Sequence, residues 1–168
     1  MKMFLVLVLS LAIGLAFSDV SEEEYSRDRA YLSKIEKAIE DIDRKISQGN
    51  VNRDILGELN SYGYPLYTLR EKYMMEKDKR SFYEKIDEVY NKMLYVKRGA
   101  FPSVLRAEFN ALNIPFCEIF TQGKNRETLV IGIKHPEDEE TVIKIMTQTQ
   151  LRNAHLIGLE NLKFEKCR

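Results

Sequence analysis

Hydrophobic residues between positions 20 and 98 recur at steps of three and four, which is the period of an amphipathic α-helix. The first series comprises Tyr25, Leu32, Ile35, Ile39, Ile42 and Ile46, with Asp28 at its one polar position. Such alternating steps place a narrow apolar stripe along one face, as in a heptad repeat. Ser21 followed by Glu24 predicts a capping box at the start of this helix, and Gly49 with Asn50 predicts its end.

Two further helical series follow. A short one begins near Asn52, and residues 62–65, which include Gly63 and Pro65, break it. A longer one opens with Leu66 and continues through Leu69, Phe82, Ile86, Val89, Met93 and Val96. Residues 76–80 inside it are all charged and lose the apolar phase, which predicts either a phase slip or a short interruption.

The two long stripes must be buried against other apolar surface. We expect residues 19–98 to form a helical hairpin or a three-helix bundle, in which the second stripe pairs antiparallel with the first. A dimeric coiled coil is the alternative, although only about three heptads support it.

From residue 99 the segments become shorter. A short helix is predicted from residues 101–103 to Asn113, with Val104, Leu105, Phe109 and Leu112 on one side. Residues 116–121 and 128–134 predict two strands joined by a polar hairpin loop. Pro136 and the acidic residues after it predict the start of a helix that ends near residue 153, and residues 156–166 predict a last strand.

The order of elements after residue 98 is therefore α-β-β-α-β. Together the two parts predict an α+β protein in which a helical hairpin or bundle over residues 19–98 precedes a module over residues 99–168. We expect this module to contain a three-stranded, mainly antiparallel sheet. If the third strand lies beside the first, in the order second-first-third, Cys117 and Cys167 come opposite each other.

The N-terminus resembles a secretory signal peptide. Met1 and Lys2 precede an uncharged run over residues 3–17, and Ala16 and Ser18 are the small residues expected before a cleavage point. We interpret residues 1–18 as a signal peptide and expect an exported protein, periplasmic or secreted. A retained membrane anchor is the alternative, but the run is shorter than the roughly 20 apolar residues of a spanning helix.

Export changes how the cysteines are interpreted. Cys117 and Cys167 are the two cysteines of the chain. In an oxidising compartment such a pair predicts a disulfide rather than a catalytic thiol or part of a metal site. Two buried free thiols are the alternative.

The charge balance argues against binding to nucleic acid. The chain has 26 basic and 26 acidic residues, and the two signs balance separately in residues 19–98 and 99–168. General binding of polyanions needs a basic excess, which neither part provides. The same balance argues against binding to an anionic membrane surface once the signal peptide is removed.

No motif in the sequence identifies an enzyme, a cofactor or a metal. The chain has no phosphate-binding Gly-rich loop, no nucleophile elbow and no clustered Cys/His ligands. His135 precedes Pro136, and His155 stands at the start of the last predicted strand. Glu118 is the carboxylate to consider: it lies between Phe116 and Phe120, and burial there would raise its pKa and favour a general acid. An edge strand, or a face turned to water, is the alternative.

Tyr62, Tyr64 and Tyr67 are the candidate residues for binding a partner. They flank the Gly/Pro break, where tyrosine rings can project and offer contact area together with a polar group. Packing inside the bundle is the alternative.

We expect a non-enzymatic exported protein that acts through protein–protein interaction, as a monomer or coiled-coil dimer. The alternatives are a small envelope hydrolase using acidic residues and, if residues 1–18 are retained, an inner-membrane-anchored regulator.

Overall fold

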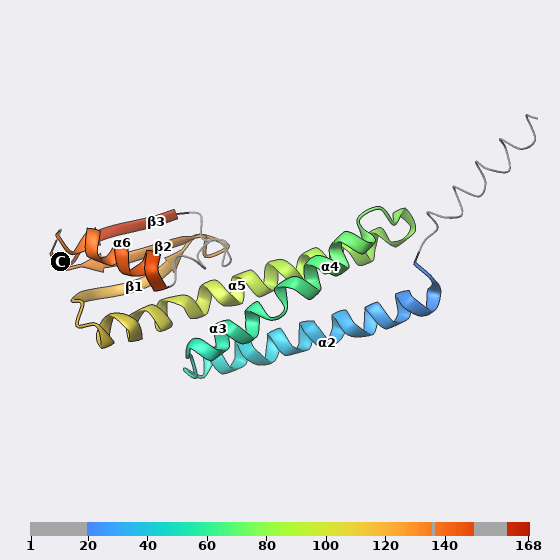
Figure 1. The fold of residues 1–168 in the computed structure, drawn as a ribbon, viewed down its shortest axis with the longest axis horizontal. Helices are drawn as coiled ribbons and strands as arrows, with labels where there is room; N and C mark the ends of the chain where they lie inside the picture. The colour runs from blue at the N-terminus through green and yellow to red at the C-terminus, as the bar shows by residue number, and fades with distance from the viewer. Residues whose placement is uncertain (1–19, 136, 150–160) are drawn as a thin grey trace, which may run out of the picture.

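The computed structural model describes residues 20–135, 137–149 and 161–168. The predicted signal peptide and His155 lie outside these residues. Figure 1 shows an elongated molecule with helices along most of its length and a sheet at one end. The α+β class predicted from the sequence is confirmed, with the helices preceding a three-stranded sheet. Within the described residues, no helix combines the length and the hydropathy needed to cross a membrane.

Three helical legs form the bundle. Its elements are α2 (Glu22–Ser47), α3 (Arg53–Asn60), α4 (Gly63–Tyr73), the short 3-10 helix η1 (Lys77–Lys79) and α5 (Arg80–Ala111). The Ser21 side chain accepts a hydrogen bond from the Glu24 backbone N–H, as the predicted cap requires. The charged stretch near residue 78 is an interruption between α4 and α5, with η1 in the gap.

The long helices α2 and α5 run parallel, which corrects the expectation of an antiparallel pair. Tyr25 meets Phe82 with ring centroids 5.3 Å apart, and Glu40 accepts a 2.6 Å hydrogen bond from Lys92, so residue numbers rise together. The antiparallel leg is the α3–α4 segment between them (Figure 1). The chain reverses direction once between α2 and α3 and again between α4 and α5, so α5 runs in the same direction as α2.

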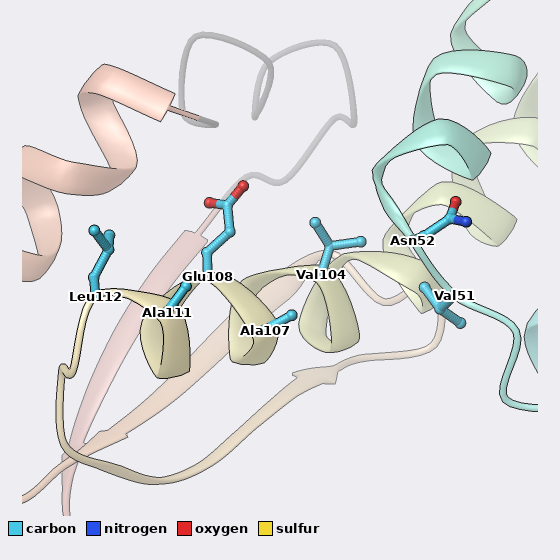
Figure 2. Close-up of a pocket in the computed structure, with 7 residues that line it drawn as sticks. All are labelled: Val51, Asn52, Val104, Ala107, Glu108, Ala111 and Leu112. Atoms are coloured by element: carbon cyan, nitrogen blue, oxygen red, sulfur yellow. The ribbon is translucent and has the colours of Figure 1, made fainter.

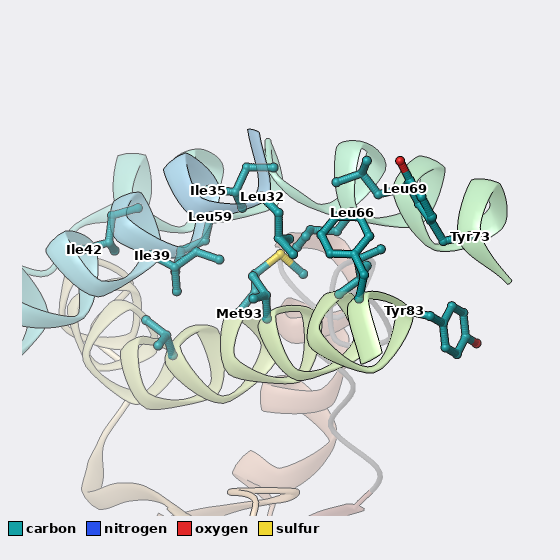
Figure 3. Packing of buried hydrophobic residues seen from close by; sticks show 14 of the residues in the cluster. Leu32, Ile35, Ile39, Ile42, Leu59, Leu66, Leu69, Tyr73, Tyr83 and Met93 are labelled. Atoms are coloured by element: carbon teal, nitrogen blue, oxygen red, sulfur yellow. The ribbon is translucent and has the colours of Figure 1, made fainter. Parts of the chain in front are cut away.

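The bundle core is a continuous cluster of buried side chains from α2, α3, α4 and α5. Figure 3 shows Ile39 of α2, Leu66 of α4 and Met93 of α5 pointing into the space between the helices. All three are almost completely buried. These are the positions that the three–four spacing places on one helix face.

The helix α5 belongs to both parts of the molecule. A separate helix was expected from residue 101, but α5 continues unbroken from Arg80 to Ala111 and contains Pro102. Proline removes one backbone hydrogen bond from a helix interior, which normally ends or bends it. Here Phe101 and Pro102 are buried, and Phe101 packs in the core under the sheet, so tertiary packing outweighs that cost. The position between residues 98 and 99 therefore lies inside one helix.

The sheet contains β1 (Phe116–Gln122), β2 (Thr128–Ile133) and β3 (Asn161–Lys166) in the order β1-β2-β3. The strands β1 and β2 pair antiparallel, whereas β2 and β3 pair parallel. The strand order second-first-third is thus wrong. The helix α6 (Asp138–Thr149) connects β2 to β3, and a strand–helix–strand unit brings its two strands together in parallel.

One face of the sheet carries the second core. Leu129, Ile131 and Ile133 of β2 pack with Phe101, Leu105 and Phe109 of α5. Val142 of α6 and Leu56 of α3 belong to the same cluster, which we call the sheet core. Because α5 and α3 contribute to it, the sheet is anchored on the end of the bundle.

Candidate functional site

The three candidate tyrosines separate into two environments. Tyr62 is half-buried and packs against the bundle core. Tyr64 and Tyr67 on α4 are 78% and 55% exposed. Packing inside the bundle therefore describes Tyr62, whereas Tyr64 and Tyr67 present their side chains to solvent.

Helical geometry explains why Tyr64 and Tyr67 point outward. The inner side of α4 is occupied by Leu66, Leu69 and Tyr73, which are all buried (Figure 3). Tyr64 and Tyr67 are three residues apart and lie on the outer side of the same helix. The sequence alone could not make this assignment, because tyrosine suits both environments.

Ion pairs hold α4 on both flanks. Arg70 pairs with Asp87 of α5 at 3.0 Å, and Lys72 pairs with Asp28 of α2 at 2.7 Å. Lys72 also contacts Glu24 of α2. The exposed tyrosines are therefore displayed from a helix fixed to both neighbours.

Asp28, the polar position of the first stripe, is explained by its contacts with α4. Asp28 accepts a 2.6 Å hydrogen bond from the Tyr73 hydroxyl as well as the Lys72 ion pair. Burial and the neighbouring Asp28 carboxylate both raise the pKa of Tyr73, so it remains protonated at neutral pH. A carboxylate among apolar residues is tolerated because α4 supplies both a donor and a charge.

Met74 extends the exposed apolar surface of α4. It is 47% exposed and lies seven residues after Tyr67, which is two helical turns along the same side. We call Tyr64, Tyr67 and Met74 the α4 surface. Sequence reasoning missed Met74 because it stands where the apolar periodicity is lost; methionine at a helix end is a weak signal.

An apolar pocket of about 470 Å³ lies between α5 and the chain just before α3 (Figure 2). Its lining consists mostly of aliphatic side chains, those of Val51, Val104, Ala107, Ala111 and Leu112. Asn52 and Glu108 are the polar residues of the lining. The pocket contains none of the candidate site residues named from the sequence, Tyr62, Tyr64, Tyr67, Glu118 and the two cysteines.

A second pocket, of about 370 Å³, surrounds the disulfide near the end of the sheet where β3 finishes. Cys117 and Cys167 are joined, which confirms that the two cysteines pair. The pocket is lined by both cysteines, Gly132 and four charged residues, Glu118, Glu165, Lys166 and Arg168. Two carboxylates from different strands thus share one pocket.

Glu118 is exposed, which agrees with the alternative that it turns to water rather than lies on a buried strand face. The pairing register of β1 shifts between Phe116 and Ile119. A β-bulge of this kind inserts an extra residue and reverses the alternation of side chains beyond it. Ile119 consequently enters the sheet core and Phe120 becomes exposed.

The hairpin loop after β1 is fastened to α5. The guanidinium of Arg126 lies 3.9 Å from the centroid of the Tyr95 ring and donates a 3.2 Å hydrogen bond to the Tyr95 carbonyl. Arg98 donates a 2.8 Å hydrogen bond to the carbonyl of Asn125. Nearby on the same helix, Lys97 is 3% exposed, and burial lowers its pKa to about 8.

Of the two histidines, only His135 lies among the described residues. His135 is exposed just after β2. In the part of the chain that the structure describes, no three His, Cys, Asp or Glu side chains are grouped so that they could hold a metal ion.

Comparison with known proteins finds similarity over most of the chain. The chain is 28% identical over 156 residues to an uncharacterized protein of Aquifex aeolicus (strain VF5), and the match covers 90% of this chain and 93% of that protein. No protein-family model matches the chain. No solved structure matches it either. The similarity therefore spans both the bundle and the sheet, and function has to be argued from the surface chemistry.

Proposed function

We propose that this is a non-enzymatic exported protein that binds another protein through the α4 surface. The single observation that carries the proposal is the exposure of Tyr64 and Tyr67 on a helix whose inner side is fully packed. Tyrosine gives a large contact area with few rotatable bonds and a hydroxyl that can hydrogen-bond, and it is enriched among energetically dominant interface residues.

The rigidity of α4 favours binding. Arg70 and Lys72 hold the helix to α5 and α2, and Leu66 and Leu69 fix it from below. A surface that is ordered before binding loses less conformational entropy on association than a loop does. Met74 adds a flexible apolar side chain that adapts to the shape of a partner.

The N-terminal pattern and the disulfide support an extracytoplasmic location. The uncharged run over residues 3–17 fits a signal peptide, and disulfides persist in oxidising compartments. N-terminal sequencing of the protein isolated from its host tests this part directly. A mature protein that begins at Asp19 agrees with export and cleavage, whereas a retained Met1 favours the membrane-anchored regulator.

The binding proposal is tested with the double variant Tyr64→Ser/Tyr67→Ser. The protein is captured from the envelope fraction of its host, and the stoichiometry of the co-purified partner is compared with that of the wild type. We expect the partner to be lost while the thermal midpoint is unchanged. An unchanged stoichiometry of the same partner would contradict the proposal, and a Glu84→Ser variant on the exposed side of α5 is the matched control.

The hydrolase alternative also has a specific observation, since Glu118 and Glu165 line the same pocket. The double variant Glu118→Gln/Glu165→Gln separates the two functions. If the protein is a hydrolase, this variant abolishes turnover of an envelope glycan. The binding proposal requires that the same variant retain the partner in full.

A further inference from the structure

The disulfide occupies an unusual place, because it joins two strands that are not neighbours. Cys117 belongs to β1 and Cys167 follows β3, while β2 lies between them. Their Cα atoms are 5.9 Å apart, although strands on either side of a third are separated by about twice the 4.8 Å strand spacing. The bridge forms where the ladder is irregular, at the bulge of β1 and just beyond the end of β3.

Gly132 of β2 makes this crossing possible. A Cβ atom at this position would overlap the Sγ atom of Cys117. The register pairs Gly132 with Glu165 of β3, and Glu118 lies beside it on β1. The disulfide therefore passes over β2 at the residue that has no side chain.

The sulfur atoms lie outside the sheet core. Ile131 and Ile133 on either side of Gly132 belong to that core, and side chains alternate between faces along a strand, so Gly132 turns to the opposite face. Cys117 is exposed, and both cysteines line the pocket of about 370 Å³. Exposed disulfides are the ones that exchange with thiols, whereas buried structural ones resist reduction.

We propose that Cys117–Cys167 is a thiol–disulfide exchange site for a dithiol, and that reduction releases the end of β3 from β1. This proposal is independent of the α4 surface. The substrate class is a reduced dithiol, either a small molecule or the Cys-x-x-Cys site of an oxidoreductase.

The exchange is balanced as a two-electron transfer. A thiolate of the dithiol enters the pocket and attacks the Cys117 sulfur, the Cys117–Cys167 bond breaks, and Cys167 leaves as a thiolate that then takes up a proton. The second thiol of the reductant attacks the mixed disulfide and releases Cys117. The protein gains two thiols, and the dithiol becomes a disulfide.

Charge favours this direction of attack. Lys166 and Arg168 stand on either side of Cys167 in the chain, and both line the pocket. Positive charge stabilises the thiolate that leaves, which speeds exchange at the other sulfur. Glu118 follows Cys117, and its negative charge disfavours a thiolate on that cysteine. Glu165 also lines the pocket, but it forms a 3.0 Å ion pair with Lys163.

The effect of reduction should be local. The end of β3 is held to β2 by the ladder and by a 2.9 Å hydrogen bond from the Cys167 N–H to the Ile133 carbonyl. The disulfide is its covalent link to β1. The bundle core contains none of these residues, so α2 and α4 have no reason to change.

The test measures the rate at which the oxidised protein is reduced by dithiothreitol and by reduced thioredoxin, with the new thiols trapped by a mass-tagged maleimide. We expect the rate to rise linearly with reductant concentration and to be unaffected by urea below the unfolding transition. Reaction with dithiothreitol alone identifies a small dithiol as the substrate, and faster reaction with thioredoxin identifies a protein. A rate that plateaus at the rate of global unfolding, with both reductants, would overturn the proposal.

Gly132→Ala provides the sharper variant. Its Cβ conflicts with the crossing disulfide and not with separated thiols, so we expect reduction to be several-fold faster. Gly57→Ala is the matched control, because a Cβ there meets no atom within 4 Å. Equal rates for the two variants would contradict the role given to Gly132.

Hydrogen exchange of a Cys117→Ser/Cys167→Ser variant keeps the local release testable if Gly132→Ala does not fold. We expect the amides of residues 161–166 to exchange at least roughly tenfold faster than in the oxidised protein, with α2 and α4 unchanged. Unchanged exchange in β3, or faster exchange throughout the bundle, would overturn the proposal that reduction releases only the end of β3.

Discussion

The bundle and the sheet achieve stability by different means. In the bundle, three helical legs surround a core, and ion pairs such as Arg70–Asp87 and Lys72–Asp28 join neighbouring helices at its margins. In the sheet, the described core lies on one face of three short strands, and a disulfide crosses the other. The helix α5 contributes to both cores.

This difference separates two kinds of surface. The bundle is stable enough through its apolar core to display exposed tyrosines on a fixed helix. Among the described residues, the sheet core has fewer buried side chains than the bundle core, and the sheet carries a covalent link that closes a loop of 50 residues. The surface proposed to bind a protein is thus on the bundle, and the chemically reversible element is on the sheet.

The largest expected effects come from opening either core. Leu66→Ala in the bundle and Leu129→Ala in the sheet each remove a side chain that is at most 1% exposed. We expect each to lower the free energy of unfolding by about 2–5 kcal/mol in urea titrations followed by circular dichroism. Because α5 is common to both cores, each variant should unfold in one transition. Two separated transitions would show that the cores are independent.

A smaller effect is expected from Lys97, which lies on α5 at the junction. Its folded pKa of about 8 lies below the usual 10.5 of lysine. Between these values the unfolded chain binds more protons, so the free energy of unfolding should rise with pH, by about 3 kcal/mol over the whole interval. Stability curves from pH 7 to 9.5 should show this rise in the wild type and lose it in Lys97→Met. Parallel curves for the two proteins would contradict burial of the amine.

Loss of the Tyr73–Asp28 hydrogen bond should lower the free energy of unfolding by about 1–2 kcal/mol. Tyr73→Phe keeps the ring in the bundle core and removes the hydroxyl that donates to Asp28. We expect a lower midpoint in urea for this variant. Tyr67→Phe, which removes an exposed hydroxyl from the same helix, should shift the free energy of unfolding by less than about 0.5 kcal/mol. If Tyr73→Phe and Tyr67→Phe lower the free energy of unfolding equally, the hydrogen bond from Tyr73 to Asp28 does not stabilise the bundle.

The smallest change in stability is expected on the α4 surface itself. Tyr64→Ser/Tyr67→Ser should stay within about 0.5 kcal/mol of the wild type, because both rings are exposed. Tyr62→Ser should cost more than the double variant, since Tyr62 packs against the bundle core. Thermal and urea unfolding of the two variants check this order. A more destabilised double variant would show that the exposed rings serve packing.

The sequence was informative where periodicity determines burial. The stripe from Leu32 to Ile42 became the inner side of α2, and the pairing of Cys117 with Cys167 followed from their number and the expected compartment. Topology was harder to predict. The direction of α5 relative to α2 depends on whether α3 and α4 form a full leg, and both arrangements bury the same stripes.

Local irregularities explain the other differences. Pro102 lies inside α5 because buried neighbours compensate for the missing hydrogen bond, and no local rule anticipates that compensation. Strict alternation would put Phe120 on the same face as Phe116, but the bulge in β1 turns Phe120 outward, since a shift of one residue moves every later side chain to the opposite face. The same bulge allows the disulfide to cross Gly132, so the pocket could not be predicted from strand alternation.

Site-specific photo-cross-linking in the native host tests the central claim most directly. A photoreactive amino acid replaces Tyr67 on α4 in one strain and Glu84 on the exposed side of α5 in another. We expect a single dominant covalent protein adduct from position 67 and none above background from position 84. Equal cross-linking from both positions, or none from position 67 in folded protein, would contradict a binding role for the α4 surface.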